Sequence, residues 1–533
     1  MAITFIKQAR GGNFHAQSHN AAYLQPDNWD DFGYKTLFSL TVFDDKGNKH
    51  TIGNVKIGFC GQTEGWTEES IQQQFDVLPD SYYSLGQDAD YYRNLVERLR
   101  DELAANVLAA LGDVAYDPDR LAIAENERAF NNSLTRTVNH TTIGHQFRRI
   151  LRREAPLTDY DFFYEKPAAQ RYSGIKVEFQ VEPNSKPSSN IHILIGRNGV
   201  GKTTLLNNMV DALLPGSGAV EETGYFGRRA ALGRTADLQK DYFAGVVSVS
   251  FSAFDPFCPP DDQSDASAGM RYCYIGLKKR DAQKDQDQWV LKDKRDLCLD
   301  FTNSLRLCFS LTAKKDRWIN AVRKLESDFN FAEMDLCQLG TVYANSSDSK
   351  SQFVEVASAL FDRMSSGHAI VLLIMTKLVE TVEEKTLVLL DEPESHLHPP
   401  LLSAFTRALS DLLVNRNGVA IIATHSPVVL QEAPKSCVSI IRRTRLVCSV
   451  DRPECETFAE NVGVLTREVF GLEVSKSGFH DLLASSVADG KSYEEIEREY
   501  KYQLGFEGKA ILRSMLATRG PMLGAKNESY SCP

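Results

Sequence analysis

The chain has 533 residues, more than one typical domain holds, so we expect about two to four folding units. Its composition, 42% hydrophobic and 25% charged, argues against a disordered protein and predicts an ordinary globular core. The net charge of −11 argues against a protein that coats DNA with its whole surface, although it permits a local basic patch.

The sequence contains no targeting or membrane signal that we can identify. Its N-terminus lacks the apolar core of a signal peptide, and the longest apolar run, 369–375, is far shorter than the ~20 residues of a spanning helix. The ten cysteines form no Cys-x-x-Cys pair, which argues against a zinc ribbon or a redox motif. We therefore expect a soluble, cytoplasmic protein with reduced thiols and no membrane partner.

The first predicted elements are a hairpin and a helix. Residues 36–59 contain two alternating apolar runs around the turn DDKGNK, which is a good hairpin signal. From 88 to 111, apolar residues recur at three- and four-residue steps and predict a helix. Residues 174–196 then predict a strand, a polar turn and a second strand that ends in a glycine-rich loop.

The second half of the chain predicts buried strands that alternate with helices. Residues 245–257 form a run rich in valine and serine, and residues 353–381 have helical character. Buried strands are then expected in TLVLLDEP (386–393) and GVAIIATHSP (418–427). Residues 258–350 show poor periodicity and are predicted to be an insertion. The alternation predicts a mainly parallel α/β sheet with a ligand at its carboxyl edge.

The glycine-rich segment ILIGRNGVGKTTLL (193–206) fits the phosphate-binding pattern G-x-x-x-x-G-K-[ST]. Glycines let backbone N–H groups surround an anion, and the following helix adds its positive end. We expect Lys202 to reach the β- and γ-phosphates and Thr203 to bind Mg²⁺. A chance glycine turn is the alternative, and the full match after a strand argues against it. The predicted nucleotide-binding residues are Gly196, Arg197, Asn198, Gly199, Val200, Gly201, Lys202, Thr203 and Thr204.

The segment LVLLDEPESHLHPP (387–400) supplies two acidic residues after an apolar strand. Asp391 is placed to contribute a carboxylate to the Mg²⁺ shell, and Glu392 to act as the general base that polarises the attacking water. Any buried strand can end in acids, so this segment is informative only together with the phosphate-binding loop. His396 and His398 could contact nucleotide across a dimer or simply pack beside Pro399.

Two more segments are informative because of their distance in the sequence from Asp391. MSSGHAIVLL (364–373) lies about 25 residues before Asp391, and Ser365 could be no more than a helix cap. IIATHSP (421–427) ends a strand in His425, about 34 residues after Asp391, where a lone histidine is more often a satisfied polar residue.

In this order and spacing, the four segments resemble an ABC-type ATPase of the SMC-like, RecF-like and OLD-like branch, over residues 171–257 and 351–430. The resemblance implies ATP and Mg²⁺ as cofactors and a homodimer or larger assembly that holds ATP between two heads. It also implies catalytic roles for Glu392, Lys202 and His425, the last as the switch histidine. Ser365, Ser366 and Gly367 resemble the core of the LSGGQ signature, which implies that they bind the γ-phosphate held by the other subunit.

Two features depart from that family. The strand VSVSFSAFD lacks the usual Q-loop glutamine, which Ser252 or Asp255 could replace. The residues after Glu392 lack the sequence of a transporter D-loop, and a Leu-His-Pro there is typical of the OLD- and RecF-like branch. A transporter subunit is therefore disfavoured.

A narrower resemblance is carried by YYSLGQDADYYRNL (82–95), VSVSFSAFDPF (247–257) and TFAENVGVLTREVFGL (457–472). These strings are similar to the PtuA ATPase subunit of Septu anti-phage systems, which is also the effector ATPase of some retrons. The resemblance spans nearly the whole chain. It implies a regulatory ATPase in bacterial anti-phage defence that controls a separate HNH nuclease, PtuB.

The predicted fold class is α/β: an ABC-type P-loop ATPase head with a mainly parallel sheet, an N-terminal β-rich portion and an inserted helical subdomain. We divide the chain into 1–170, a β-rich then helical part of the head; 171–257 and 351–430, the ATPase core; 258–350, an inserted lid or arm; and 431–533, a partner-docking region.

The sequence predicts no nuclease chemistry in this chain. Residues 431–533 contain no Asp-x-Asp pair of the kind that a Toprim domain needs, and Asp285 and Asp287 are expected in a solvated loop.

Between Arg271 and Lys324 there are fourteen Lys and Arg residues against seven Asp, a local charge of +7. The clusters LKKR (277–280), KDKR (292–295) and KKDRW (314–318) could bind the phosphates of DNA or of a retron RNA–DNA hybrid. A solvated face that balances acidic neighbours explains them equally well. The main alternative function is a RecF-like, ATP-dependent DNA-binding clamp in repair.

Overall fold

The computed structural model describes residues 3–9, 18–138, 140, 142–152, 159–169, 173–214, 220–229, 235–238, 242–252, 257–263, 270–280, 289–346, 350–445, 447–474 and 478–518. The chain divides into two compact units, Met1–Ala459 and Glu460–Pro533. Each unit is described by itself.

The N-terminal part of the first unit is a six-stranded sheet in the order β7-β1-β2-β4-β5-β8, with only β1 and β2 paired in parallel. The hairpin predicted at 36–59 is confirmed, because β4 and β5 pair in antiparallel orientation. The strands are β1 (Thr4–Lys7), β2 (Ala21–Pro26), β4 (Leu37–Phe43), β5 (Lys49–Phe59), β7 (Gln74–Phe75) and β8 (Tyr82–Gly86), and a small pair is formed by β3 (Tyr34–Lys35) and β6 (Gly65–Trp66).

The helical structure predicted over 88–111 is confirmed, but it forms two helices, because the backbone is extended at Leu99 and Arg100. This break separates α1 (Ala89–Arg98) from α2 (Asp101–Leu111), although the apolar spacing continues across it. The remaining α-helices of this part are α3 (Pro118–Ala124) and α4 (Arg148–Leu151).

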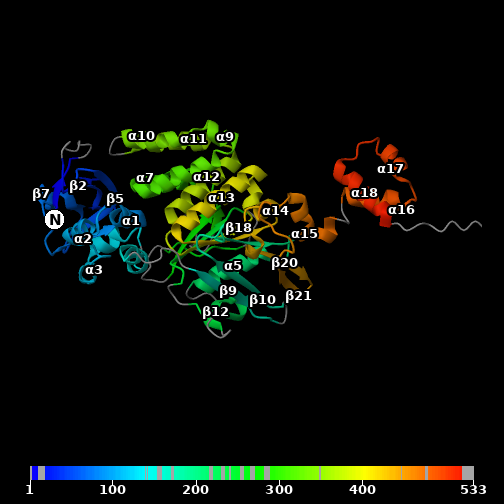
Figure 1. Cartoon of the computed structure of the whole chain (residues 1–533), viewed down its shortest axis with the longest axis horizontal. Coiled ribbons are helices and arrows are strands. Elements are labelled where there is room, and N and C mark those ends of the chain that lie inside the picture. The colour runs from blue at the N-terminus through cyan, green and yellow to red at the C-terminus, as the bar shows by residue number, and fades with distance from the viewer. Residues whose placement is uncertain are drawn as a thin grey trace, which may run out of the picture. The chain divides into compact units, whose positions relative to one another are not determined.

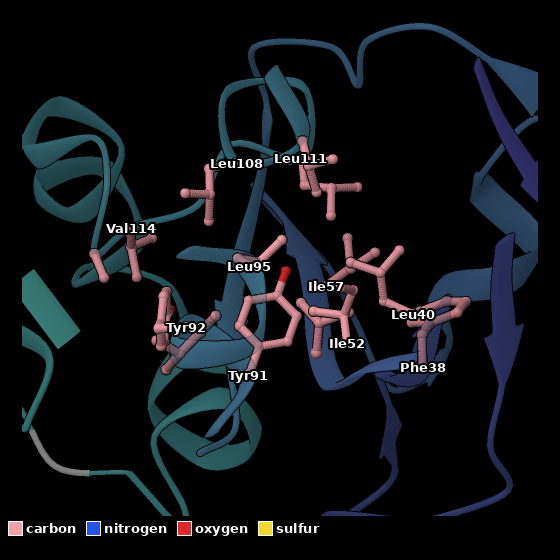
Figure 2. Close-up of a cluster of buried hydrophobic side chains, with 14 of the residues drawn as sticks. Phe38, Leu40, Ile52, Ile57, Tyr91, Tyr92, Leu95, Leu108, Leu111 and Val114 are labelled. Carbon is pink, nitrogen blue, oxygen red and sulfur yellow. The ribbon is translucent and has the colours of Figure 1, made fainter. Parts of the chain in front are cut away.

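These helices and the sheet share one hydrophobic core that lies within residues 3–150. Figure 2 shows Tyr91 and Leu95 of α1 close to Ile52 and Ile57 of β5, and all four are at most 1% exposed. Burial of each aliphatic side chain of this size contributes about 1.5–3 kcal/mol. The N-terminal part is thus organised around a core of its own.

The rest of the first unit, which we call the head, contains a seven-stranded sheet. Its strand order is β15-β14-β18-β19-β11-β20-β21, and it is parallel throughout except for β21. The predicted α/β class with a mainly parallel sheet is confirmed. The strands are β11 (Ile191–Ile195), β14 (Gly245–Ser250), β15 (Arg271–Gly276), β18 (Thr386–Asp391), β19 (Val419–Thr424), β20 (Val438–Thr444) and β21 (Val447–Asp451).

Helix α5 (Lys202–Leu213) packs between this sheet and a second, antiparallel sheet in the order β10-β9-β12-β13 (Figure 1). Met209 of α5 lies in one buried cluster with Leu389 of the large sheet and Phe226 of the small one. The small sheet consists of β9 (Tyr160–Lys166), β10 (Ile175–Val181), β12 (Tyr225–Arg229) and β13 (Thr235–Asp237), and α6 (Val220–Thr223) precedes β12.

Helices α12 (Ser366–Thr381) and α13 (Pro399–Arg416) cover the opposite face of the large sheet (Figure 1). The inserted helices α7 (Lys294–Ser310) and α8 (Thr312–Leu325) pack on them. The other elements of this region are β16 (Lys278–Arg280), β17 (Trp289–Leu291), α9 (Phe329–Glu333), α10 (Leu339–Asn345) and α11 (Ser351–Arg363), and α14 (Pro427–Leu430) follows β19.

Three of the predicted region boundaries differ from the elements that the structure shows. Strand β15 falls in the predicted insertion, yet it pairs along its whole length with β14 in the large sheet. Strands β20 and β21 fall in the predicted C-terminal region and belong to the same sheet, and β9 begins before residue 171. The compact C-terminal unit starts at Glu460, whereas the predicted C-terminal region starts at residue 431.

The C-terminal unit is a small group of helices: α15 (Val462–Val474), α16 (Phe479–Ala488), α17 (Tyr493–Glu499) and α18 (Phe506–Thr518). Leu483, Val487, Ile496 and Leu512 form its core. No helix in the described parts of either unit is both long and apolar enough to cross a membrane.

A buried network of charges joins the N-terminal part, the insertion and the head. Asp88, which caps α1, lies 2.6 Å from Arg317 of α8 and 3.4 Å from Arg416 at the end of α13. Glu383 lies 2.7 Å from Arg416 and 2.8 Å from Lys314 of α8. Burial alone would raise the pKa of Asp88, but Arg317 and Arg416 lower it, so the carboxylate stays charged. Loss of any one of these partners leaves the remaining buried charges only partly compensated.

We predict that Arg317→Met lowers the free energy of unfolding by about 3–5 kcal/mol, because Asp88 loses its nearest cation. Lys324→Met on the same helix is the matched control. Its ion pair with Asp411 is half exposed (51% and 49%), and its loss should cost less than about 1 kcal/mol. Urea unfolding followed by circular dichroism measures both, and equal effects would contradict a special role for the network.

Candidate nucleotide-binding site

The phosphate-binding loop leaves the buried strand β11 and enters α5 at Lys202. Gly199 and Gly201 have φ of 82° and 98°, a left-handed conformation that favours glycine. A methyl group at Gly196 would collide with the carbonyl oxygen of Ile441 in the neighbouring strand β20. The loop therefore needs glycine at these three positions. Of the other predicted loop residues, Val200 is buried and Arg197, Asn198 and Thr204 are exposed.

Lys202 lies inside the loop rather than in solvent, with only 4% of its surface exposed. Its Nζ donates hydrogen bonds to the carbonyl oxygens of Gly196 at 3.0 Å and Arg197 at 3.2 Å. Burial lowers the pKa of Lys202, and the carboxylates of Glu392, Glu394 and Asp391 oppose this shift. The ammonium group is thus held at the loop by backbone dipoles and nearby acids.

The two residues predicted to bind a metal meet at the carboxyl edge of the sheet. Thr203 lies in the first turn of α5 and donates from its Oγ1 to Oδ1 of Asp391, at the end of β18, across 3.2 Å. A hydroxyl and a carboxylate are the oxygen ligands that Mg²⁺ takes in nucleotide sites, where phosphates and water complete its shell. The donor set therefore fits Mg²⁺.

Glu392 adopts a left-handed backbone conformation, with φ of 44°, directly after β18. Non-glycine residues in this region cost about 1–3 kcal/mol and are found where the surroundings fix them. Here the N–H of Glu392 donates to the carbonyl oxygen of Ala423 in β19 at 2.9 Å. One carboxylate oxygen of Glu392 lies 3.7 Å from Nδ1 of His425, so the predicted base and switch histidine are neighbours.

Glu394 is a site residue that the sequence patterns did not single out. Its Oε1 accepts hydrogen bonds from Oγ1 of Thr424 at 2.7 Å and from the N–H of His425 at 2.6 Å, and it lies 3.0 Å from Nδ1 of His425. The side chain of Glu394 is only 8% exposed. It connects the end of β18 to the end of β19 and holds His425 in place.

The signature-like residues lie at the start of the 16-residue helix α12. Ser365 caps this helix through the N–H of His368, and its Oγ lies 2.6 Å from Nδ1 of the same histidine. Ser366 is exposed, and a methyl group at Gly367 would lie 2.5 Å from the carbonyl oxygen of His396. The helix N-terminus is thus formed as a cap, with the segment after Glu392 packed against it.

A carboxylate from the insertion orients this helix start. Asp328, which caps α9, lies 3.1 Å from Nε2 of His368 and 3.0 Å from Nε2 of His398, and it is 8% exposed. Burial raises the pKa of Asp328, but hydrogen bonds from the Phe331 N–H and His368 lower it on balance. Asp328 was not predicted, because nothing in its local sequence marks it.

The remaining residues considered in the sequence analysis are His396, Ser252, Asp255, Asp285 and Asp287. Nε2 of His396 lies 3.2 Å from the carbonyl oxygen of Phe251, so this histidine contacts the chain directly after β14. Ser252 follows that contact, whereas Asp255, Asp285 and Asp287 lie outside the described residues.

Many cations of the 271–324 segment are paired with acids. The ion pairs are Lys279–Asp296, Arg280–Asp261, Lys292–Asp300, Lys294–Asp362, Lys314–Glu383, Arg317–Asp88 and Lys324–Asp411. The excess positive charge counted from the sequence is therefore compensated in part by acids inside and outside the segment.

Comparisons with known proteins found one family model and several solved structures that match parts of the chain. Residues 349–431 match the family model described as "AAA domain, putative AbiEii toxin, Type IV TA system". Solved structures that match part of the chain include cbiO1 from Clostridium perfringens, part of the ABC transporter complex cbiONQ (16% identity, 52% of this chain and 83% of that one, TM-score 0.26). A second match is UvrA2 from Deinococcus radiodurans (15% identity, 54% of this chain and 37% of that one, TM-score 0.25). A third is an SMC head bound to the C-winged helix domain of ScpA (12% identity, 55% of this chain and 97% of that one, TM-score 0.27).

A much stronger relation exists to one phage protein. Protein ea59 of Escherichia phage lambda is 46% identical over 529 residues, which cover 97% of this chain and 99% of that protein. Identity at this level over the full length shows common family membership. The chain therefore belongs to the family of the phage lambda protein ea59.

Proposed function

We propose that the chain binds ATP with Mg²⁺ and hydrolyses it between two copies of itself, and that this cycle controls a partner nuclease in anti-phage defence. The observation that supports ATP binding most is the meeting of Lys202, Thr203 and Asp391 at one edge of the parallel sheet. Glu392 and His425 at the same edge support hydrolysis.

The loop residues supply the binding of phosphate. Backbone N–H groups of the loop and the N-terminus of α5 provide fixed positive ends for the phosphate oxygens. Lys202 exchanges its two neutral carbonyl acceptors for β- and γ-phosphate oxygens, whose negative charge attracts the ammonium group more strongly. Thr203 and Asp391 would hold Mg²⁺, which neutralises phosphate charge in the transition state.

Glu392 acts as the general base. Its carboxylate accepts a proton from water as the water oxygen bonds to the γ-phosphorus and ADP leaves. His425 donates a hydrogen bond to the γ-phosphate, and Glu394 fixes the imidazole through its backbone and ring contacts. The strained backbone at Glu392 keeps the base at a fixed position relative to the sheet edge.

The signature-like segment acts on the nucleotide of the second copy. Ser365, Ser366 and Gly367 form the N-terminus of a long helix, whose positive end favours an anion such as the γ-phosphate. Asp328 and His368 keep the Ser365 hydroxyl in one orientation. ATP bound to one head would therefore bring the two heads together.

The proposed role in defence is supported by the resemblance to PtuA, and it is compatible with a relative from phage lambda, protein ea59. The matched family model carries the name of a toxin of a toxin–antitoxin system. We propose that the C-terminal unit docks the nuclease, in the bacterial cytoplasm. This unit exposes large apolar side chains suited to a protein contact: Phe479, Leu482, Tyr502 and Phe506.

A RecF-like DNA clamp is the second candidate. DNA or an RNA–DNA hybrid would contact the 271–324 segment, but phosphates would have to displace ion pairs such as Lys279–Asp296 and Arg280–Asp261. This cost makes nuclease control the better-supported proposal.

We predict that Glu394→Ala lowers the kcat for ATP hydrolysis by about 10- to 100-fold, because His425 loses its anchor, a loss of about 1–3 kcal/mol. The affinity for ATP should change far less, since the phosphate-binding loop is intact. Ser395→Ala, at the exposed neighbouring position, should behave as the wild type. A phosphate-release assay and equilibrium ATP binding measure the two quantities. An unchanged kcat would remove Glu394 from its assigned role.

We predict that the tagged chain, expressed with its native flanking genes, co-purifies with a small HNH protein in fixed stoichiometry. Mass spectrometry of the purified complex identifies the partner. Recovery of the chain alone or only with DNA would contradict nuclease control and favour the clamp.

A further inference from the structure

Strand β20 continues past the carboxyl edge of the large sheet beside the phosphate-binding loop. It pairs in parallel with β11 up to Ile195 and Ile440, and the next residues, Gly196 and Ile441, are in such close contact that no side chain fits at Gly196. The residues that follow Ile441 therefore lie next to the loop itself.

Side chains alternate between the two faces of a strand, so two neighbouring arginines of β20, Arg442 and Arg443, lie on opposite faces of the sheet. Ile441 belongs to the buried cluster that contains α5, so Arg443, two residues on, lies on the face of α5. A methyl group built on Gly201 would lie 3.3 Å from Nη1 of Arg443. Arg442 points to the other face and is paired with Asp451 at 2.8 Å.

The charges around Arg443 leave it uncompensated. Within the described part of the chain, Arg443 has no carboxylate within ion-pair distance, and its side chain is exposed. A second cation, Lys166 of β9, has a lowered pKa: burial is the largest cause, Glu222 opposes the shift, and Arg443 is close enough to add to it. A surface cation next to another cation and a loop that binds anions is suited to a negatively charged ligand.

We propose that Arg443 is a phosphate ligand of the bound nucleotide, a role that neither the loop pattern nor the comparisons assign to it. Gly201 belongs to the loop whose N–H groups bind the α- and β-phosphates, so the guanidinium contacts the diphosphate portion rather than the γ-phosphate. Arg443 therefore stabilises ATP and ADP equally. The inference rests on the proposed binding of ATP.

The test is the affinity of the full-length chain for ATP, ADP and inorganic pyrophosphate, measured by isothermal titration calorimetry with Mg²⁺. Arg443→Met should weaken all three by about 10- to 100-fold, the usual effect of one charge-assisted hydrogen bond. Arg443→Lys should retain part of the affinity, because a point charge replaces the planar guanidinium. Arg442→Met, one residue away, should bind as the wild type.

Each other result has a distinct meaning. Wild-type affinities in Arg443→Met, or an equal loss in Arg442→Met, overturn the inference and leave ATP binding standing. Loss for ATP with unchanged pyrophosphate affinity also overturns it, since the contact would then be to the nucleoside. A wild-type chain that binds none of the three ligands overturns the proposed function as well. Unchanged melting temperatures of the ligand-free variants confirm that folding is not the cause.

Discussion

The candidate site depends on one arrangement of backbone hydrogen bonds, the parallel pairing of β19 between β11 and β18. Parallel strands end at the same edge, so the phosphate-binding loop, Asp391 and His425 meet there although they are up to 232 residues apart in the chain (193 to 425). The edge is stabilised by side chains as well as by backbone: Thr203 contacts Asp391, and Glu394 connects β18 to the residues that follow β19. A change in this register would separate the groups that the proposed chemistry requires.

A second constraint is the way in which the insertion contacts the head. Buried carboxylates make these contacts. Asp88 of the N-terminal part and Glu383 of the head pair with α8 of the insertion, and Asp328 of the insertion pairs with the start of α12. Buried ion pairs add little net stability, but they penalise any arrangement that separates the partners. Asp328 of the insertion contacts His368, and His368 contacts Ser365, so the start of α12 is held by the insertion.

The parts of the fold and site that could be predicted are those with a local signal. The glycine loop, the acidic end of β18 and the helix cap at Ser365 are each contained in a short segment, and their chemistry follows from residue type and spacing. The break between α1 and α2 has no such signal, because the apolar spacing continues through Leu99. Strand β15 is six residues long in an aperiodic region, and only its partner β14 shows that it belongs to the sheet. Glu394, Asp328 and Arg443 act through contacts with distant segments, which no local pattern contains.

ATP hydrolysis between two copies is tested most directly by the behaviour of Glu392→Gln with ATP, measured by size-exclusion chromatography with light scattering and by a phosphate-release assay. We predict that this variant binds ATP, hydrolyses it at least about 100-fold more slowly than the wild type and accumulates as a dimer that ADP does not support. Glu355→Gln, on the exposed face of α11, serves as the control. Wild-type turnover in Glu392→Gln, or a mass that ATP leaves unchanged, would contradict hydrolysis by this glutamate between two heads.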